Sequence, residues 1–413
     1  MPNMFRSLAL RDYRVYVFGH LFSQAGTWMQ RLGVIWAVFE ITDSGVSTGI
    51  ASACLFGPAL LLSPLAGLLV DRRNLRNILL ATKVGLSASA VLFTLIGFNN
   101  PTSPGPYFVV AACFGIVETF DIPARMAFIG ELVERPDLPN AVGLNTATMN
   151  LSRVIGPTIG GVLISTVGVE WSFATNFVLS LAVLASMLSI KPKFQPPDVS
   201  ADQGGVLAGF SVAWLDPTLR NVFLLYTMLS IFVMAFPVTL PLFADRVLSG
   251  GAGIFTLLFA ALSAGSILGA LVVARQSSPD LRFLGGTGLW TALSLLALAV
   301  APTTAIATAA AFVVGTTTMA FITGAITAVQ LSAPQATRGR VLALISMIGV
   351  GSRALGGLLI GWIVDVFDAR LAVGLGSMVA LLGGTLSLLE VRRLGQVAEV
   401  PVLAGPLPSV ERD

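Results

Sequence analysis

Two acids and an arginine stand close together near residue 120 of an otherwise apolar segment. Glu118, Asp121 and Arg125 are separated by three and four residues, so in a helix they share one face. Ionisable side chains at membrane depth are costly and usually functional. Glu118 is the acid that lies well inside the apolar segment, and we expect it to exchange a proton. Asp121 is a second proton-coupling candidate.

A polar stripe also runs through the first apolar segment. His20, Gln24, Trp28 and Arg31 follow one another at spacings of four, four and three residues. His20 titrates nearer neutrality and could assist proton exchange, while Trp28 could stack on an aromatic or cationic substrate. The alternative is a stripe that only packs and hydrogen-bonds between helices. Arg31 argues against it, because a lone arginine at that depth needs water or a counter-charge.

Glu118 has an alternative role as well. Arg153 interrupts a neighbouring apolar segment at a similar depth and has the opposite charge. A resting salt bridge between the two would make Glu118 structural. Burial favours a protonated carboxyl and a nearby arginine favours an ionised one, so substrate or conformational change could tip the balance.

Other kinds of chemistry lack their residues. One histidine and two cysteines, both cysteines inside apolar runs, indicate neither a metal site nor a disulfide framework. No phosphate-binding glycine loop with its lysine is present, which excludes an ATP-driven pump within this chain. The net charge of +3 gives no reason to expect a nucleic-acid partner. We therefore expect no enzyme, no cofactor and no metal.

These side chains must be positioned by membrane helices. Of 413 residues, 55% are hydrophobic and only 11% are charged, less than half the charged share usual in soluble domains. A bilayer core needs about 20 apolar helical residues per span. The apolar segments and their turn signals predict an all-α membrane protein with twelve helices, at 13–40, 47–70, 77–98, 107–127, 140–166, 172–190, 220–245, 252–274, 284–301, 305–332, 341–366 and 371–391.

The basic residues predict the orientation. An even number of spans puts both termini on one side, and no cleavable signal peptide is expected. Nearly all lysines and arginines outside the predicted spans fall on the terminal side, whereas only Arg246 and Arg370 fall on the other. The positive-inside rule then places both termini in the cytoplasm, in a multi-pass protein of the cytoplasmic (inner) membrane.

The chain contains an internal repeat. Ser152-Arg153-Val154-Ile155-Gly156-Pro157 returns 200 positions later as Ser352-Arg353-Ala354-Leu355-Gly356-Gly357. Six predicted helices lie between the copies, so both run in the same direction, as in one repeat design of secondary transporters. We expect a bundle at 1–192, a cytoplasmic linker at 193–216 and a second bundle with a short tail at 217–413, in a monomer.

The loop after the second predicted helix resembles a signature of the major facilitator superfamily. It reads Gly67, three residues, Asp71-Arg72-Arg73 and then Asn74, where the family usually has Gly, followed by Arg76. Asparagine also tolerates a left-handed turn. In the second half the corresponding acid is absent.

Further motifs resemble the drug/proton antiporter branch of that superfamily. The fifth predicted helix carries Gly156-Pro157-Thr158-Ile159-Gly160-Gly161 after Arg153, similar to an antiporter motif. Together with Phe120-Asp121-Ile122-Pro123-Ala124-Arg125, it resembles enterobactin-exporter-like (transmembrane secretion effector) proteins. The glycines could instead serve only close helix packing.

The resemblance implies a cavity and a latch. In that fold the first, fourth, seventh and tenth helices line a central cavity, which would gather Gln24, Trp28, Arg31 and Glu118 on one wall and Tyr226, Thr323 and Thr327 on a neutral opposite wall. It also implies that Asp71, Asp121 and Arg340 latch the two halves in the outward-facing state, with Gly67, Arg72 and Arg76. Alternatively, these arginines only anchor the topology.

The leading hypothesis is a secondary exporter of amphipathic small molecules, whether drugs, siderophores or metabolites, working by proton antiport and alternating access. Its partners would be the solute, protons and the lipid bilayer. One alternative is a lipid or lysolipid translocator of the same fold. Another, of a different class, is a non-transporting membrane receptor or scaffold.

Overall fold

The computed structural model describes residues 5–190, 206–233, 235–276, 279–334 and 337–398, and within these ranges it contains helices and no β-strand. The N-terminal half consists of α1 (Arg11–Thr42), α2 (Gly45–Arg72), α3 (Leu75–Phe98), α4 (Gly105–Leu132), α5 (Leu138–Thr166) and α6 (Val169–Ser189), with 3-10 turns at Arg6–Ala9 and Arg135–Asp137. After α7 (Val206–Leu215), the C-terminal half consists of α8 (Pro217–Val233), α9 (Phe236–Arg246), α10 (Gly251–Ala274), α11 (Leu281–Ala299), α12 (Thr304–Ser332), α13 (Arg338–Val366) and α14 (Ala369–Ala398).

Each predicted helix has a counterpart, with two differences. The seventh corresponds to two described helices, α8, whose described part runs to Val233, and α9, which begins at Phe236 with a proline in its first turn; residue 234 lies outside the described part of the chain. The predicted linker holds the short helix α7, while residues 191–205 lie outside the described part of the chain.

Within the described residues, ten helical stretches are long and apolar enough to cross a membrane. Helices α1 and α5 are not among the ten, and they carry Arg31 and Arg153. In the middle of α1, Gln24, Gln30 and Arg31 are buried and do not face lipid. The count of twelve spans therefore stays a prediction that depends on these two helices.

Capping side chains set several helix starts. Asn74 is extended, with φ −63° and ψ 117°, and its side chain accepts a hydrogen bond from the Asn77 amide at 3.2 Å. It caps α3 rather than forming a left-handed turn. Asp280 caps α11 in the same way through the Phe283 amide, at 2.9 Å.

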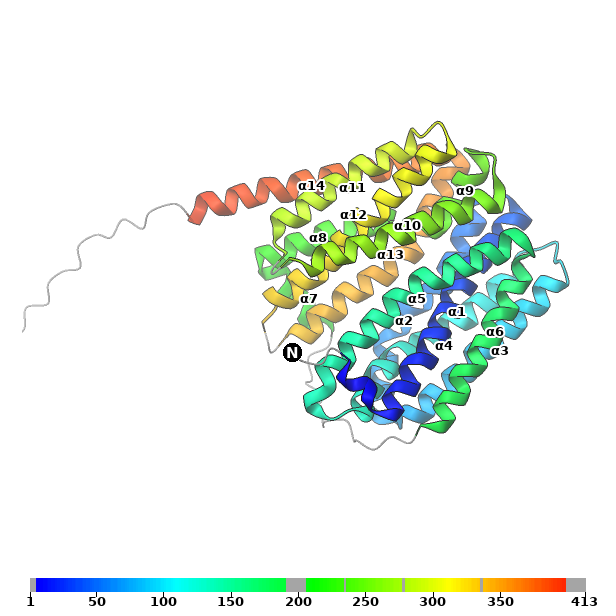
Figure 1. Ribbon diagram of the computed structural model, residues 1–413. Helices are drawn as coiled ribbons and strands as arrows, with labels where there is room; N and C mark the ends of the chain where they lie inside the picture. Colours follow the sequence, from blue (N-terminus) through cyan, green and yellow to red (C-terminus); the bar gives the residue numbers. More distant parts are fainter. Residues whose placement is uncertain (1–4, 191–205, 234, 277–278, 335–336, 399–413) are drawn as a thin grey trace, which may run out of the picture.

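The helices gather in two groups, α1–α6 and α8–α14 (Figure 1). Equivalent glycines of the repeat make equivalent contacts inside each group. Gly156 of α5 lies against the Ala25 carbonyl of α1, and Gly356 of α13 lies against the Ile231 carbonyl of α8. Added side chains would collide with backbone at both places, so the repeat encodes close helix approach.

The same two helices also join the halves. Gly361 of α13 lies against the Gly45 carbonyl of α2, and a Cβ on Gly161 of α5 would lie 2.6 Å from the Thr256 side chain of α10. Both contacts lie where α1 ends and α2 begins, which we call the distal end. The opposite end, where α1 begins, is the terminal end.

The α2–α13 contact reaches from the distal end to the middle of both helices. It continues as far as Leu60 and Gly351, near the middle of the two helices. Beyond it, Leu61 of α2 is 80% exposed and Leu65 and Leu68 are also exposed. Among the described side chains, the halves thus meet from the distal end to the middle of the bundle.

Candidate functional site

Three arginines converge on one tryptophan at the middle of the bundle. The guanidinium carbons of Arg31 (α1), Arg153 (α5) and Arg353 (α13) lie 4.5, 5.6 and 5.9 Å from the ring centroid of Trp28. Phe56 of α2 lies 5.2 Å from Arg31 and 5.4 Å from Arg353. Because α13 belongs to the C-terminal half, the group spans both halves. We call it the central arginine cluster: Trp28, Arg31, Phe56, Glu118, Arg153 and Arg353.

The repeat explains why two of these arginines meet. Arg153 and Arg353 occupy equivalent positions near the midpoints of α5 and α13, two 29-residue helices. Glu118 lies at the midpoint of α4. A midpoint position in helices that cross the membrane puts the charges near the centre of the bilayer, where they are most costly.

Glu118 pairs with Arg31. Their side chains form a buried ion pair, with Glu118 6% and Arg31 8% exposed. The salt bridge weighed from the sequence, between Glu118 and Arg153, is not the pair that forms. The long side chain of Arg31 reaches the depth of Glu118. It thereby finds the counter-charge that its position required.

Arg153 and Arg353 differ from Arg31. Neither forms an ion pair with any carboxylate in the described part of the chain. Both are half-buried and interact electrostatically with each other and with Arg31, and Tyr226 of α8 is a neighbour of both. The central arginine cluster thus has three cations and one acid, an excess of positive charge at membrane depth.

A second group of charges lies within the N-terminal half, toward the terminal end. Asp121 accepts from Lys83 Nζ at 3.0 Å, from Arg125 Nη1 at 3.3 Å and from Thr82 Oγ1 at 2.8 Å. The three ionic side chains are at most 3% exposed. We call Thr82, Lys83, Asp121 and Arg125 the α3–α4 ion network. Here both cations share one carboxylate inside a single half.

Lys83 is the member that the sequence did not reveal. It lies inside the predicted helix 77–98, next to a charge-free run, and no partner was expected for it. Its position two turns into α3, which begins at Leu75, was the available signal of burial.

His20 and Gln24 do not join the central arginine cluster through any described contact. The His20 ring stacks on Tyr16 at 5.6 Å, and Arg125 and Lys83 are its electrostatic neighbours. Its Nε2 is buried with no hydrogen-bond partner among the described atoms. His20 therefore lies nearer the α3–α4 ion network, while Gln24 is buried within α1.

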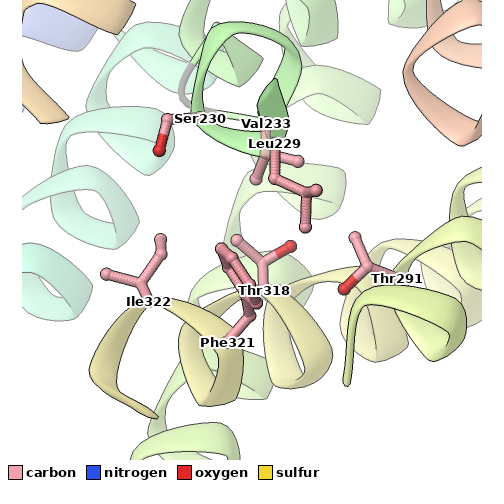
Figure 2. Close-up of a pocket in the computed structure, with 7 residues that line it drawn as sticks. All are labelled: Leu229, Ser230, Val233, Thr291, Thr318, Phe321 and Ile322. Carbon is pink, nitrogen blue, oxygen red and sulfur yellow. The ribbon is translucent and has the colours of Figure 1, made fainter. Parts of the chain in front are cut away.

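Of the residues expected on the opposite wall of the central cavity, only some lie near the central arginine cluster. Tyr226 lies beside the cluster, whereas Thr323 and Thr327 are linked along α12 by a hydrogen bond of 2.9 Å. Within this half, a small gap lies between α8, α11 and α12 (Figure 2). It has no room for a water molecule, so it is not a small-molecule pocket. It is lined by Leu229, Ser230, Val233, Thr291, Thr318, Phe321 and Ile322.

The predicted latch stays a prediction. The side chains of Asp71 and Arg340 lie outside the described part of the chain. Arg76 donates to the carbonyls of Met187 and Leu188 at 3.4 and 3.3 Å, which connects α3 with α6. Arg72 is exposed, and a Cβ on Gly67 would meet nothing within 4 Å.

The antiporter-like helix packs closely on α1. Gly160 lies against the side chain of Met29, and Pro157 is buried beside it. These contacts account for the small residues by packing; a special role in antiport remains an expectation from the resemblance.

A polar cluster that the sequence did not predict closes the distal end. Asp365 of α13 accepts from the Gly45 and Val46 amides of α2, at 2.7 and 2.9 Å. Arg246 of α9 lies 3.1 Å from Asp365 and 3.4 Å from Asp43, which follows α1. We call Asp43, Gly45, Val46, Arg246 and Asp365 the distal clamp. It ties both halves together at the positive end of the α2 dipole.

Comparison with known proteins identifies the chain. A model of the transmembrane secretion effector family matches residues 4–411. The chain belongs to this family. The enterobactin exporter EntS of Escherichia coli O1:K1 / APEC is 26% identical over 379 residues, 87% of either protein. The staphyloferrin A transporter of Staphylococcus aureus is 24% identical over 275 residues, 66% of this chain and 68% of the relative.

The fold agrees with this family. A bacterial homolog of the human lysosomal transporter Spinster, in an inward-facing and occupied conformation, matches 93% of this chain and 97% of its own with a TM-score of 0.69 at 13% identity. The major facilitator architecture expected from the motifs is therefore confirmed. This member of the transmembrane secretion effector family is a multi-pass membrane transporter rather than an enzyme.

Proposed function

We propose that this protein is a secondary exporter of amphipathic small molecules that works by alternating access, with Glu118 as the group through which protons act on the cycle. The observation that carries the proposal is the central arginine cluster. It lies at the midpoint of the helices and draws side chains from both halves. A site there would change its geometry whenever the halves rock against each other.

Similarity to the enterobactin exporter over 87% of both proteins supports outward transport of a small molecule. Similarity to the staphyloferrin A transporter, which extends over 66% of this chain, also supports transport of a small molecule.

The positive-inside rule supports a cytoplasmic terminal end. With that orientation the distal end faces outward, and it is the end at which α2 meets α13 and α5 meets α10. The described contacts then correspond to an inward-facing state in which the outer side is closed.

Release to the outside requires the distal clamp to open. Asp365 would leave the amide groups at the start of α2 and its partner Arg246, so the clamp is a set of bonds that holds only one end-state. Breaking it favours the outward-facing state by population shift.

Glu118 offers a place for a proton. Ionised, it is held by Arg31. Protonated, it would release Arg31 to the rest of the cluster. Antiport, the direction predicted from the sequence, requires a proton to enter as the substrate leaves.

The main test uses everted vesicles with an acidic interior and a pH-sensitive dye, to which lipophilic cations, siderophores and lysolipids are added in turn. We expect at least one compound to move protons with wild type and none to do so with Glu118→Gln. Glu131→Gln, on the same helix, is the matched control and should behave as wild type. If no compound is transported or moves protons, the proposed function is wrong.

The clamp is tested through Ser52→Cys, placed in a background without Cys54 and Cys113. Ser52 is 2% exposed and donates to the Arg353 carbonyl between α2 and α13. Adding Asp365→Asn should speed thiol labelling from the distal side at least severalfold, because the clamp opens more often. Asp368→Asn, an exposed cap at the same end, should leave labelling unchanged. Equal labelling rates in both variants would show that the clamp does not control the distal end.

A further inference from the structure

We propose that the central arginine cluster is the binding site for an organic anion with two acidic groups, held by Arg153 from one half and Arg353 from the other. The inference rests on the proposed function in that it takes the cluster as the transport site, and it names the substrate class. Transport itself and the class of substrate are separated by the tests below.

The first argument is charge. Arg31 has Glu118 as its partner, whereas Arg153 and Arg353 have no carboxylate partner in the described part of the chain. Cation–π contacts with Trp28 and Phe56 lower the free-energy cost of burying the two guanidinium groups, but they do not neutralise the positive charges. Two arginines beside the same indole ring at membrane depth need an anion or water. A cationic solute would add a further like charge to this place.

The second argument is access. Trp28 is half-buried, although residues 23–27 and 29–39 on either side of it in α1 are buried. Arg153 and Arg353 are half-buried as well, while their neighbours Ser152 and Ala354 are buried. These three side chains are thus less buried than their helix neighbours, and a ligand would approach the cluster at their exposed surface, although Arg153 Nε itself is buried.

The third argument is geometry. Both guanidinium groups lie within 6 Å of one indole ring, and each can hold a carboxylate in a bidentate manner. Because they come from opposite halves, one acidic group on each arginine would bridge α5 and α13. The ligand would then replace the repulsion between the halves by attraction, so occupancy would favour their approach. Trp28 adds an aromatic surface, which suits an organic rather than an inorganic anion.

An anionic substrate also fixes the sign of proton coupling. An anion near Arg31 competes with ionised Glu118, so the protonated form of Glu118 and the bound anion favour each other. Arg31, Arg353 and Lys83 are the charged groups that act on Glu118 from the neighbouring helices. Anion affinity should therefore rise as the pH falls. A proton that binds together with the anion leaves with it, so this substrate would be exported with the proton and not by the antiport expected from the sequence. An interior-negative membrane potential still drives a dianion outward when one proton accompanies it.

Binding is measured by calorimetry on the full-length protein in lipid nanodiscs, with phthalate as an aromatic dianion, benzoate as its monoanion, sulfate as an inorganic dianion and tetraphenylphosphonium as a lipophilic cation. We expect phthalate to bind at least about tenfold more tightly than the other three. Arg153→Gln and Arg353→Gln should each weaken phthalate at least about tenfold, as for one lost charge-assisted contact. Arg353→Lys keeps the charge and should weaken it less.

Two further variants make the test independent of folding. Arg14→Gln, an exposed arginine on α1, is the control and should bind phthalate as wild type does. Glu118→Gln frees Arg31, so it should bind phthalate more tightly than wild type and without dependence on pH. A merely structural role for Glu118 would not produce this gain.

Several results would overturn the proposal. These are equal binding of phthalate in wild type and both glutamine variants, sulfate binding as tight as phthalate, and preferred binding of tetraphenylphosphonium. If phthalate binds as expected but no compound crosses vesicles, the anion site stands and the proposed function fails. If the protein transports a cation and binds none of the anions, the proposed function is supported and the proposed anion site is wrong.

Discussion

The central arginine cluster and the α3–α4 ion network place charge inside the same bundle in opposite ways. In the network, Lys83 and Arg125 share Asp121 within one half, and all three are almost completely buried. In the cluster, Arg153 and Arg353 come from different halves, stay half-buried and lack a carboxylate among the described residues. The satisfied network suits a part that holds its shape, whereas the unsatisfied, shared cluster suits a part that binds and moves.

The largest effect is expected in the network. Asp121→Asn leaves Lys83 and Arg125 as buried cations without a carboxylate partner, so it should lower the free energy of unfolding by about 3–5 kcal/mol. Thermal unfolding in detergent measures this loss. Adding Lys83→Met should recover part of it. Asp137→Asn, whose partner Arg6 is largely exposed, should change stability by less than about 1 kcal/mol. A loss no greater in Asp121→Asn than in this control would show that the network is not a stabilising unit.

A smaller effect is expected where the cluster has its one ion pair. Glu118→Gln removes the charge that faces Arg31 but keeps an amide oxygen, and Arg31 still lies over three aromatic rings. We expect a loss of about 1–3 kcal/mol in the free energy of unfolding, by the same thermal measurement. Stability equal to that of Asp121→Asn would remove the contrast between the two regions.

The smallest effect, with the opposite sign, is expected for the arginines without a carboxylate. Arg153→Gln removes a positive charge that repels Arg31 and Arg353. In the absence of ligand it should leave the free energy of unfolding unchanged or raise it by up to about 1 kcal/mol, while phthalate binding weakens at least about tenfold. Thermal unfolding with and without phthalate measures both. A clear destabilisation without ligand would mean that Arg153 is structural.

Much of the fold follows from local patterns. Long charge-free runs ended by turns such as Asn99-Asn100-Pro101 locate the helices, and the repeat around Arg153 and Arg353 predicts two parallel halves. The start of α9 at Phe236 was not predicted, because apolar residues lie on both sides of it. The count of twelve stays a prediction, because α1 and α5 are less apolar than ordinary spans.

The sequence predicted several residues of the candidate site but not how they pair. Periodicity placed Trp28 and Arg31 on one face of α1 and showed that Arg31 needs a counter-charge. It did not show that Glu118 would supply it, and it offered Arg153 as the partner of Glu118 instead. Lys83 and Asp365 were missed, because each lies near the edge of an apolar run and there looks like an ordinary flanking charge.

The sequence by itself determined which segments are helical, which residues share a face and how deep each lies along its own helix, because these depend on spacing within one helix. The tertiary structure decided which faces meet: Arg31 with Glu118, Lys83 with Asp121, and Arg153 with Arg353 around Trp28. Helical periodicity fixes the angle of a side chain about its own axis but not the rotation of one helix against another. That rotation depends on packing of the whole bundle, and it separates a paired charge from one left open to a ligand.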